Sequence, residues 1–409
     1  MTRLTDAALP TDEPGWRRRQ REAAFGTFLA AGLPDPQDEV WRYAPLDKLT
    51  LDDVELATPA VGAIETAVGG RSPAAVLTVR AGALVDVQLA VGTSGLTVST
   101  DADESTLGSL VGADDPFAAL NLALCPGPVV LDVARGAQLD GPVVLLVDCP
   151  DGASFPRVLL RAGTGSRVRV LEHLTGAAAT LVAPVGEYLV EDGATVAVRT
   201  VQTLGPRTWS IGRTRARIGT DATFDQAVVG LGASYDRVRA DAILRGDGAE
   251  SRLHTAHVGT DDQVHDLRTM QVHLGQRTRS RLRSRAAVAG RSGSIYSGLI
   301  TMRSGAKRAD AEQVNRSLVL SNEAHADAVP NLDIEENDVR CAHASSVGPV
   351  DPEQRWYLES RGVSPADAVQ LIVEGFFGEV EVLLDDVVLA AQLRDAISNL
   401  DVSSAAGAS

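Results

Sequence analysis

Two potential metal ligands stand two residues apart near the end of the chain, in the stretch Asp338 to Gly348. Cys341 and His343 belong to a set of only three cysteines and seven histidines. If the stretch is extended, side chains at i and i+2 share one face, with Cα atoms roughly 6–7 Å apart. A thiolate and an imidazole placed in this way can bind a soft or borderline metal such as iron, zinc or copper. The alternative, and the more common outcome for an isolated Cys-x-His pair, is a buried cysteine packing as a small hydrophobe beside a hydrogen-bonded histidine.

A second group of histidines lies earlier in the chain, at His254, His257, His265 and His273. A metal site is one interpretation of this group. In strands, however, the odd spacing of His254 and His257 directs them to opposite faces. Neither an H-E-x-x-H helix nor an obvious carboxylate triad accompanies them. The sequence therefore favours strand histidines whose hydrogen bonds are satisfied over a metal site.

Composition excludes several classes of protein. The net charge of −16 argues against nucleic acid as the main partner. The three cysteines, Cys125, Cys149 and Cys341, are odd in number and widely scattered, which indicates a reducing compartment rather than a disulfide framework. The first residues are polar, and no apolar run approaches 18 residues. We therefore expect a soluble, cytoplasmic protein.

The elements that must position these residues are short β-rich runs between about residues 76 and 340. Hydrophobic residues make up 44% of the chain but aromatic residues only 4%, so the core must consist of Val, Leu, Ala and Ile. The turns between the runs recur every 27 to 30 residues, which is typical of stacked repeats and predicts a β-helix rather than an immunoglobulin-like sandwich. The recurring pairs are Gly136-Ala137, Gly165-Ser166, Gly193-Ala194, Asp221-Ala222, Gly248-Ala249, Gly275-Gln276 and Gly305-Ala306.

Helical patterns flank this body and define three expected regions: 1–75 helical, 76–348 β-helix and 349–409 helical. In the first region a helix is expected from Trp16 to Ala31, ending at Gly32. The segment Glu39 to Leu46, with Trp41 and Tyr43, is either an anchor for the N-terminal arm or a ligand-stacking site.

In the last region, Asp351-Pro352 and the capping box Ser364 to Asp367 start two helices. A third is expected from about Val380 to Leu400, followed by a frayed polar tail over 401–409. The apolar stripe with Phe376-Phe377 fits either a core or a docking groove for a partner.

The chain resembles the SufB/SufD family of iron–sulfur cluster assembly proteins, and within it the SufD-type subunits. The resemblance spans essentially the whole chain and is most specific from about residue 265 to 377. Asn315 lies at or near the position of a scaffold cysteine in SufB-type members, which favours the SufD type. The stretches that carry the resemblance are Glu39–Leu46, His265–His273, Gly290–Gly298, Ala311–Leu320, Pro330–Ile334, Asp338–Gly348, Trp356–Gly362 and Gly375-Phe376.

The resemblance implies a right-handed parallel β-helix that pairs end to end with SufB and docks the SufC ATPase through its C-terminal helices. It also implies a scaffold for a nascent iron–sulfur cluster at the SufB interface, with His343 as a ligand of iron or cluster and Cys341 as structural support or an auxiliary thiolate. In the family motif Cys-Ser-His-Gly-Ala-Thr-Val-Gly, Ala344 here replaces the first glycine and Ser346 replaces the threonine. These replacements concern the backbone that follows His343. An exposed β-helix end also permits a homodimer when the chain is isolated.

The expected function is thus that of a non-enzymatic scaffold. No G-x-x-x-x-G-K-[ST] phosphate loop is present, so nucleotide binding is assigned to the partner. One alternative is a carbohydrate-active β-helix enzyme, which needs paired carboxylates; Asp261-Asp262 is the best adjacent pair. The other alternative is a purely structural subunit in which Cys341 and His343 are both inert.

Overall fold

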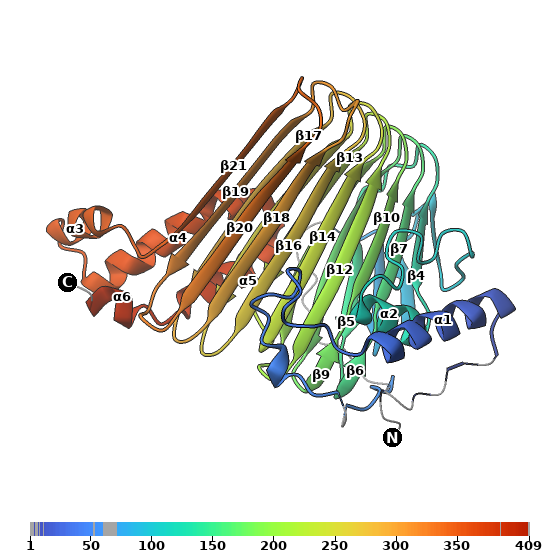
Figure 1. Cartoon of the computed structure of the whole chain (residues 1–409), viewed down its shortest axis with the longest axis horizontal. Coiled ribbons are helices and arrows are strands. Elements are labelled where there is room, and N and C mark those ends of the chain that lie inside the picture. The colour runs from blue at the N-terminus through green and yellow to red at the C-terminus, as the bar shows by residue number, and fades with distance from the viewer. Residues whose placement is uncertain are drawn as a thin grey trace.

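The centre of the molecule is a parallel β-solenoid made of two long sheets (Figure 1). It is seen in a computed structural model that describes residues 4, 7, 9–10, 12–51, 54–59, 72–384 and 386–407. The first sheet holds ten strands, in the order β2 (Ala83–Leu89), β1 (Ala75–Arg80), β5 (Val143–Asp148), β8 (Arg167–Gly176), β11 (Thr195–Leu204), β13 (Thr223–Gly230), β15 (Glu250–Gly259), β17 (Arg279–Val288), β19 (Asp310–Val319) and β21 (Arg340–Gly348).

The second sheet faces the first and holds eleven strands. Nine form its main path, and the short strands β6 (Gly152–Ser154) and β9 (Ala179–Val182) pair beside it. The path runs β20 (His325–Ile334), β18 (Gly293–Met302), β16 (Val264–His273), β14 (Tyr235–Leu244), β12 (Trp209–Ile218), β10 (Val185–Val190), β7 (Arg157–Ala162), β4 (Val129–Val133) and β3 (Leu96–Ser99). The predicted β-helix is confirmed as a mainly β fold with a parallel solenoid and helices toward both ends of the chain.

Parallel pairing places residues about one coil apart side by side. Ser280 of β17 pairs with Ser251 of β15 on one side. On its other side, the same residue pairs in register with β19. Among the strands that the structure describes, only the first depart from this scheme, since β1 pairs β2 and β3 pairs β4 in antiparallel fashion. Because the register is kept from coil to coil, each inward position becomes one step in a column that runs along the solenoid.

The recurring turns form a second ladder along one corner of the solenoid. The backbone N–H of Gly165 donates to the carbonyl of Asp192 at 2.9 Å, and that of Gly193 donates to Thr220 at 2.8 Å. The donor in each turn has a positive φ, which glycine adopts without strain. In the last two turns, however, this residue is Arg277 (φ 53°) or Arg308 (φ 59°), not the glycine that the sequence pattern indicated.

The N-terminal arm packs on the outer face of the second sheet (Figure 1). It contains α1 (Gly15–Ala31), which ends at Gly32 as predicted, and a 3₁₀ turn η2 (Leu46–Lys48). Trp41 is buried, packs against Phe117 and lies 3.9 Å from the Arg237 guanidinium, so this segment is an anchor and not an open stacking site.

One helix lies within the stretch that was expected to hold only strands. It is α2 (Pro116–Leu124), whose N-terminus is capped by Asp115 accepting hydrogen bonds from Phe117 and Ala118. Nearly all its residues are buried, because the helix is sandwiched between α1 and the sheet. A helix that is apolar on every side has no periodic apolar stripe, so the sequence pattern did not reveal it.

The C-terminal helices are α3 (Pro352–Ser360), α4 (Pro365–Leu384), α5 (Val387–Ser398) and α6 (Ser403–Gly407). Helices α4 and α5 cover the outer face of the first sheet over its later strands, whereas α3 and α6 pack on α4 (Figure 1). The Ser364–Asp367 capping box forms as predicted, with the Ser364 hydroxyl accepting from the Asp367 N–H. The expected start of the third helix near Val380 was wrong, because α4 continues to Leu384, and α6 occupies part of the predicted frayed tail.

Of the two interpretations of the apolar stripe with Phe376-Phe377, a core is the one that forms for part of it. Val373 and Phe377 of α4 are fully buried against Ala256 and Val258, which point outward from β15. Residues 60–71 of the expected N-terminal region lie outside the described residues. None of the described helices is both long and apolar enough to span a bilayer.

Candidate functional site

The solenoid ends on two long strands that each lack a neighbour on one side, β20 and β21. β20 pairs only with β18, and β21 pairs only with β19, among the strands that the structure describes. Side chains that would be core in an earlier coil are exposed here: Leu332 by 38%, Ile334 by 46% and Val347 by 44%. The end of the coil is therefore an open, partly apolar edge with unpaired backbone groups.

Cys341 lies on β21 and points into the end of the coil. It packs against a small cluster that includes Ile300 and Met302 of β18 and Ala311 of β19. Burial and the nearby Asp310 carboxylate raise the pKa of its thiol. Its environment therefore favours a thiol that packs as a small hydrophobe over a reactive thiolate.

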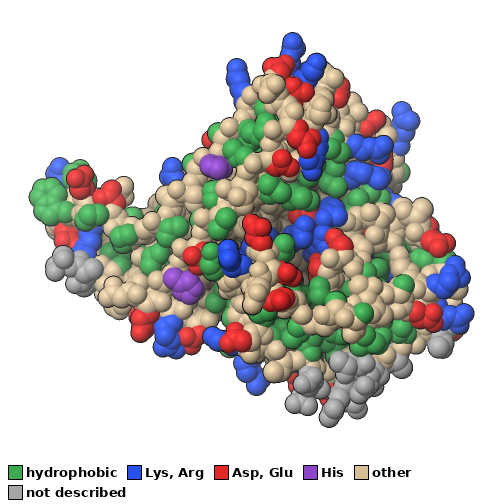
Figure 2. Space-filling view, viewed as in Figure 1, with side chains coloured by type: hydrophobic (Ala, Val, Ile, Leu, Met, Phe, Trp, Pro, Cys, Tyr) green, Lys and Arg blue, Asp and Glu red, His purple; other side chains and the backbone are tan. Residues whose placement is uncertain are grey.

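His343 follows two residues later on the same face of β21, as the i, i+2 spacing predicted. It is exposed, and its ring makes no hydrogen bond to any other described residue. It lies in register beside Gln313 of β19, whose buried side-chain oxygen and nitrogen also lack partners. A free imidazole at an open coil end is available to a ligand or partner that approaches along the solenoid axis. Figure 2 shows histidine side chains at the surface over these last coils.

The other two cysteines cannot join this site. Cys125 and Cys149 are fully buried, and burial raises the pKa of the Cys149 thiol to about 12. All three cysteines are free. Asn315, which was placed at the scaffold-cysteine position of the other subunit type, is buried and donates to the Ser345 hydroxyl at 3.4 Å.

A groove lies on the outer side of the same edge, between β19, β21 and helices α3 and α4. Its volume is about 1110 Å³, and Arg316, Ser346, Leu358 and Phe376 contribute to its walls. Near it, Trp356 is 69% exposed, and Tyr357 and Leu371 are also exposed. The projecting C-terminal helices carry apolar side chains on their surface in Figure 2. Exposed apolar surface of this kind on a folded protein indicates an interaction site.

The histidine group is divided by the fold. His254 points outward and His257 inward, as their odd spacing predicted. His273 is satisfied, because its Nδ1 lies 2.8 Å from the Thr278 hydroxyl and its Nε2 lies 3.0 Å from that of Ser280. His265 was wrongly expected to be satisfied, since neither ring nitrogen has a hydrogen-bond partner.

His257 and His265 instead meet inside the coil with Asp236, which the sequence did not single out. Burial lowers the pKa of His257 to about 4, so its ring is neutral near pH ~7. Burial opposes ionisation of Asp236, but the adjacent His265 outweighs it and lowers the pKa of the carboxyl. The signal that could have found Asp236 is its spacing of one coil from His265, because these residues pair in register.

The acidic pair Asp261-Asp262 does not form a catalytic dyad. Asp262 is exposed and its carboxylate is held by Arg291 at 2.6 Å. Asp261 occupies a positive-φ turn position, and its carbonyl accepts from the Arg291 N–H.

The fold and this edge define a two-sheet β-solenoid whose last strands stay open. The SUF system FeS cluster assembly SufBD core domain matches residues 145–376. An iron–sulfur cluster assembly SufBD family protein of Mycobacterium tuberculosis is 31% identical over 360 residues, which cover 85% of this chain and 84% of that protein. The iron–sulfur cluster assembly protein SufD of Bacillus subtilis is 33% identical over 269 residues, 64% of this chain and 61% of that protein. The chain belongs to the SufBD family, and its role lies in iron–sulfur cluster assembly.

Proposed function

We propose that the protein is a non-enzymatic scaffold subunit in which His343 provides an imidazole ligand to iron or to a nascent iron–sulfur cluster. The observation that carries this proposal is the exposed, unpartnered ring of His343 on an edge strand that faces the open end of the coil. Imidazole is a good ligand for iron, and one ligand from each of two chains can make a shared site. Iron and sulfide are here the cargo of assembly, not resident groups.

The partner at this edge is SufB. Strands β20 and β21 offer unpaired N–H and C=O groups, and Leu332, Ile334 and Val347 offer apolar surface beside them. A second solenoid added strand to strand would satisfy the backbone groups and bury the apolar side chains. The same edge would support a homodimer when SufB is absent.

The SufC ATPase docks on the C-terminal helices, at the groove between α3, α4 and the outer side of β21. The exposed Trp356, Tyr357 and Leu371 supply the aromatic and aliphatic anchors that dominate binding energy at protein interfaces. In this arrangement the partner carries out nucleotide hydrolysis and this chain transmits the movement to the cluster edge. The three free cysteines fit action in the reducing cytoplasm.

The ligand role is tested by expressing the chain with SufB and SufC and measuring iron and sulfide in the purified complex. His343→Ala is expected to assemble with both partners and to lose most of the bound iron and sulfide. His325→Ala is the matched control, because His325 is also exposed on an edge strand but pairs beside Gly293 at the start of β20. A His343→Ala complex with the iron and sulfide content of the control would refute the ligand role.

The docking role is tested separately by capture of SufC. Trp356→Ala is expected to weaken SufC binding by at least about 10-fold, the effect of removing a central aromatic anchor. Leu29→Ala removes another exposed apolar side chain, 53% exposed, from α1 at the other end of the chain, and should leave SufC binding unchanged. Equal capture of SufC by both variants would show that SufC does not bind at α3.

A purely structural subunit is the competing function, and the packed, high-pKa thiol of Cys341 is the observation in its favour. It requires that the double variant Cys341→Ala/His343→Ala deliver clusters at the wild-type rate. Maturation of a recipient iron–sulfur protein by the reconstituted complex distinguishes the two functions.

A further inference from the structure

Three ligand-type side chains meet inside the solenoid, away from the open edge. Asp236 of β14, His257 of β15 and His265 of β16 bring one donor atom each within 4.8 Å of one another. All three residues are buried. They come from three consecutive strands and from both sheets, so the two walls of the coil converge on one point.

Four polar atoms of this cluster have no hydrogen-bond partner: both ring nitrogens of His265 and both carboxylate oxygens of Asp236. The closest approach between the two side chains is 3.5 Å, from His265 Nδ1 to Asp236 Oδ2. Buried polar groups are almost always hydrogen-bonded, and a carboxylate buried without a hydrogen bond is among the most costly. The cluster is therefore incomplete as it stands, whereas His273 on the same strand has both nitrogens satisfied.

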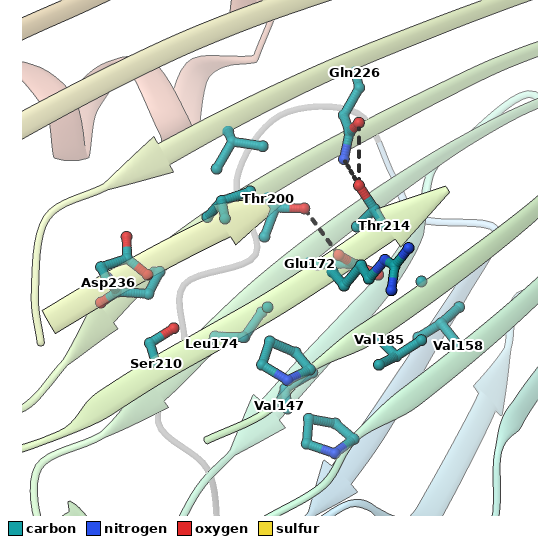
Figure 3. A pocket seen from close by; sticks show the side chains of 18 of the residues that line it. Val147, Val158, Glu172, Leu174, Val185, Thr200, Ser210, Thr214, Gln226 and Asp236 are labelled. Atoms are coloured by element: carbon teal, nitrogen blue, oxygen red, sulfur yellow. Dashed lines mark hydrogen bonds between the residues drawn. The ribbon is translucent and has the colours of Figure 1, made fainter. Parts of the chain in front are cut away.

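The backbone at Gly230 lies close against two of these side chains. A Cβ on Gly230 would lie 2.7 Å from Asp236 Oδ2 and 2.7 Å from His257 Cδ2, so the two side chains occupy the space that any other residue would fill. Asp236 also borders a cavity of about 70 Å³, together with Ser210 and Gly212 (Figure 3). This volume is several times the roughly 10–15 Å³ that one water needs, so the cavity that Asp236 borders has room for an additional small ligand such as water.

We propose that Asp236, His257 and His265 bind a single divalent transition-metal ion of the Zn²⁺ or Fe²⁺ class inside the solenoid. Two imidazoles and one carboxylate are a common donor set for these ions, whereas Ca²⁺ and Mg²⁺ prefer oxygen ligands alone. Each of the three residues would give one donor atom to the ion, which would join β14, β15 and β16 and so tie the two sheets together. Unlike the site at His343, this one is complete within one chain and depends on no partner.

The experiment uses the purified full-length chain alone, stripped of metal and titrated with Zn²⁺ or Co²⁺. Wild-type protein is expected to bind one ion per chain, to show the visible absorption of Co²⁺ held by nitrogen and oxygen, and to melt at a higher temperature with Zn²⁺ present. Loss of an outer-shell partner alone typically weakens metal affinity 10–100-fold, so Asp236→Asn and His265→Asn are expected to weaken binding by at least about 100-fold. His273→Gln, which alters a satisfied histidine on the same strand, should retain wild-type affinity.

Two further measurements keep the proposal open to refutation if a variant does not fold. X-ray absorption of the zinc-loaded wild-type protein should show imidazole scattering and no sulfur ligand. The double variant Cys341→Ala/His343→Ala should still bind the ion, which separates this site from the edge site. Absence of binding, sulfur ligation, or equal affinity in Asp236→Asn and His273→Gln would overturn the proposal.

Discussion

The interior of the solenoid changes character along its length. In the early coils the inward side chains are aliphatic, such as Leu145, Leu160 and Val170, all fully buried. In the late coils the equivalent inward positions carry polar groups such as Thr255, Gln271 and Asn315, also buried. Both halves share one backbone architecture, so the difference lies in the side chains alone.

The difference separates stability from chemistry. An aliphatic column gains free energy from every coil added, at about 25 cal/mol per Å² of apolar surface removed from water. A polar column gains less and must find partners, as Thr255 does with Ser284 at 3.0 Å. Where partners are missing, as at Gln313 and His265, the interior retains groups that can bind something else.

The largest expected effect is in the aliphatic half. Leu160→Ala removes a fully buried side chain from the main core and should cost about 2–5 kcal/mol of stability. Ser284→Ala in the late half loses one hydrogen bond and should cost about 1 kcal/mol. Thermal and denaturant midpoints of the two variants measure this contrast, and equal losses would show that the halves contribute alike.

Glu172 lies in the aliphatic half, two residues from Val170 on the same face of β8, and burial raises the pKa of its carboxyl despite the hydrogen bond from Thr200. The folded chain therefore binds this proton more tightly than the unfolded chain. The resulting stability is fully present below the ordinary pKa of 4.5 and is lost as the pH rises through the raised value.

Glu172→Gln should accordingly be more stable than wild type at neutral pH, by less than the loss in Leu160→Ala. The gap should close as the pH falls towards 4.5, the ordinary pKa. Melting temperatures across this range check the prediction. Glu187→Gln serves as the comparison, because in the wild-type chain the Glu187 carboxylate is ion-paired to Arg157. A gap that widens on acidification would show that Glu172 is stabilised as the anion.

At the open edge, Cys341→Ala should cost about 1 kcal/mol, a typical loss for a single substitution. The loss comes from packing on Ile300 and Met302. The variant complex should keep its iron and sulfide, in contrast to His343→Ala. Loss of both in Cys341→Ala would make this thiol a ligand as well.

Effects of about 1 kcal/mol or less are expected in the turns that link the coils. Gly165 has φ 70° and open space where a Cβ would stand, so Gly165→Ala should cost about 1 kcal/mol through backbone strain alone. Arg277 already bears that strain at φ 53°, and Arg277→Gly should be neutral or stabilising by less than about 1 kcal/mol. Chemical denaturation resolves the opposite signs, and a destabilised Arg277→Gly would show that the arginine side chain contributes more than its backbone costs.

Local patterns in the sequence were sufficient for the repeat and for the shared face of Cys341 and His343. Turn spacing and strand alternation depend on neighbours in the chain, so they can be read without the fold. The same holds for the helix caps at Asp351 and Ser364, where partners lie within three residues.

Contacts between coils and layers were decided only by the tertiary structure. Asp236 meets His265 because stacking sets residues about one coil apart side by side, and His257 joins them from the opposite sheet. Phe377 is core because α4 lies on the outer face of β15. The sequence alone determined the repeating coil and which strand face each side chain takes. Which distant side chains meet was decided by closure of the two sheets around a shared interior, because such contacts depend on register and layer packing.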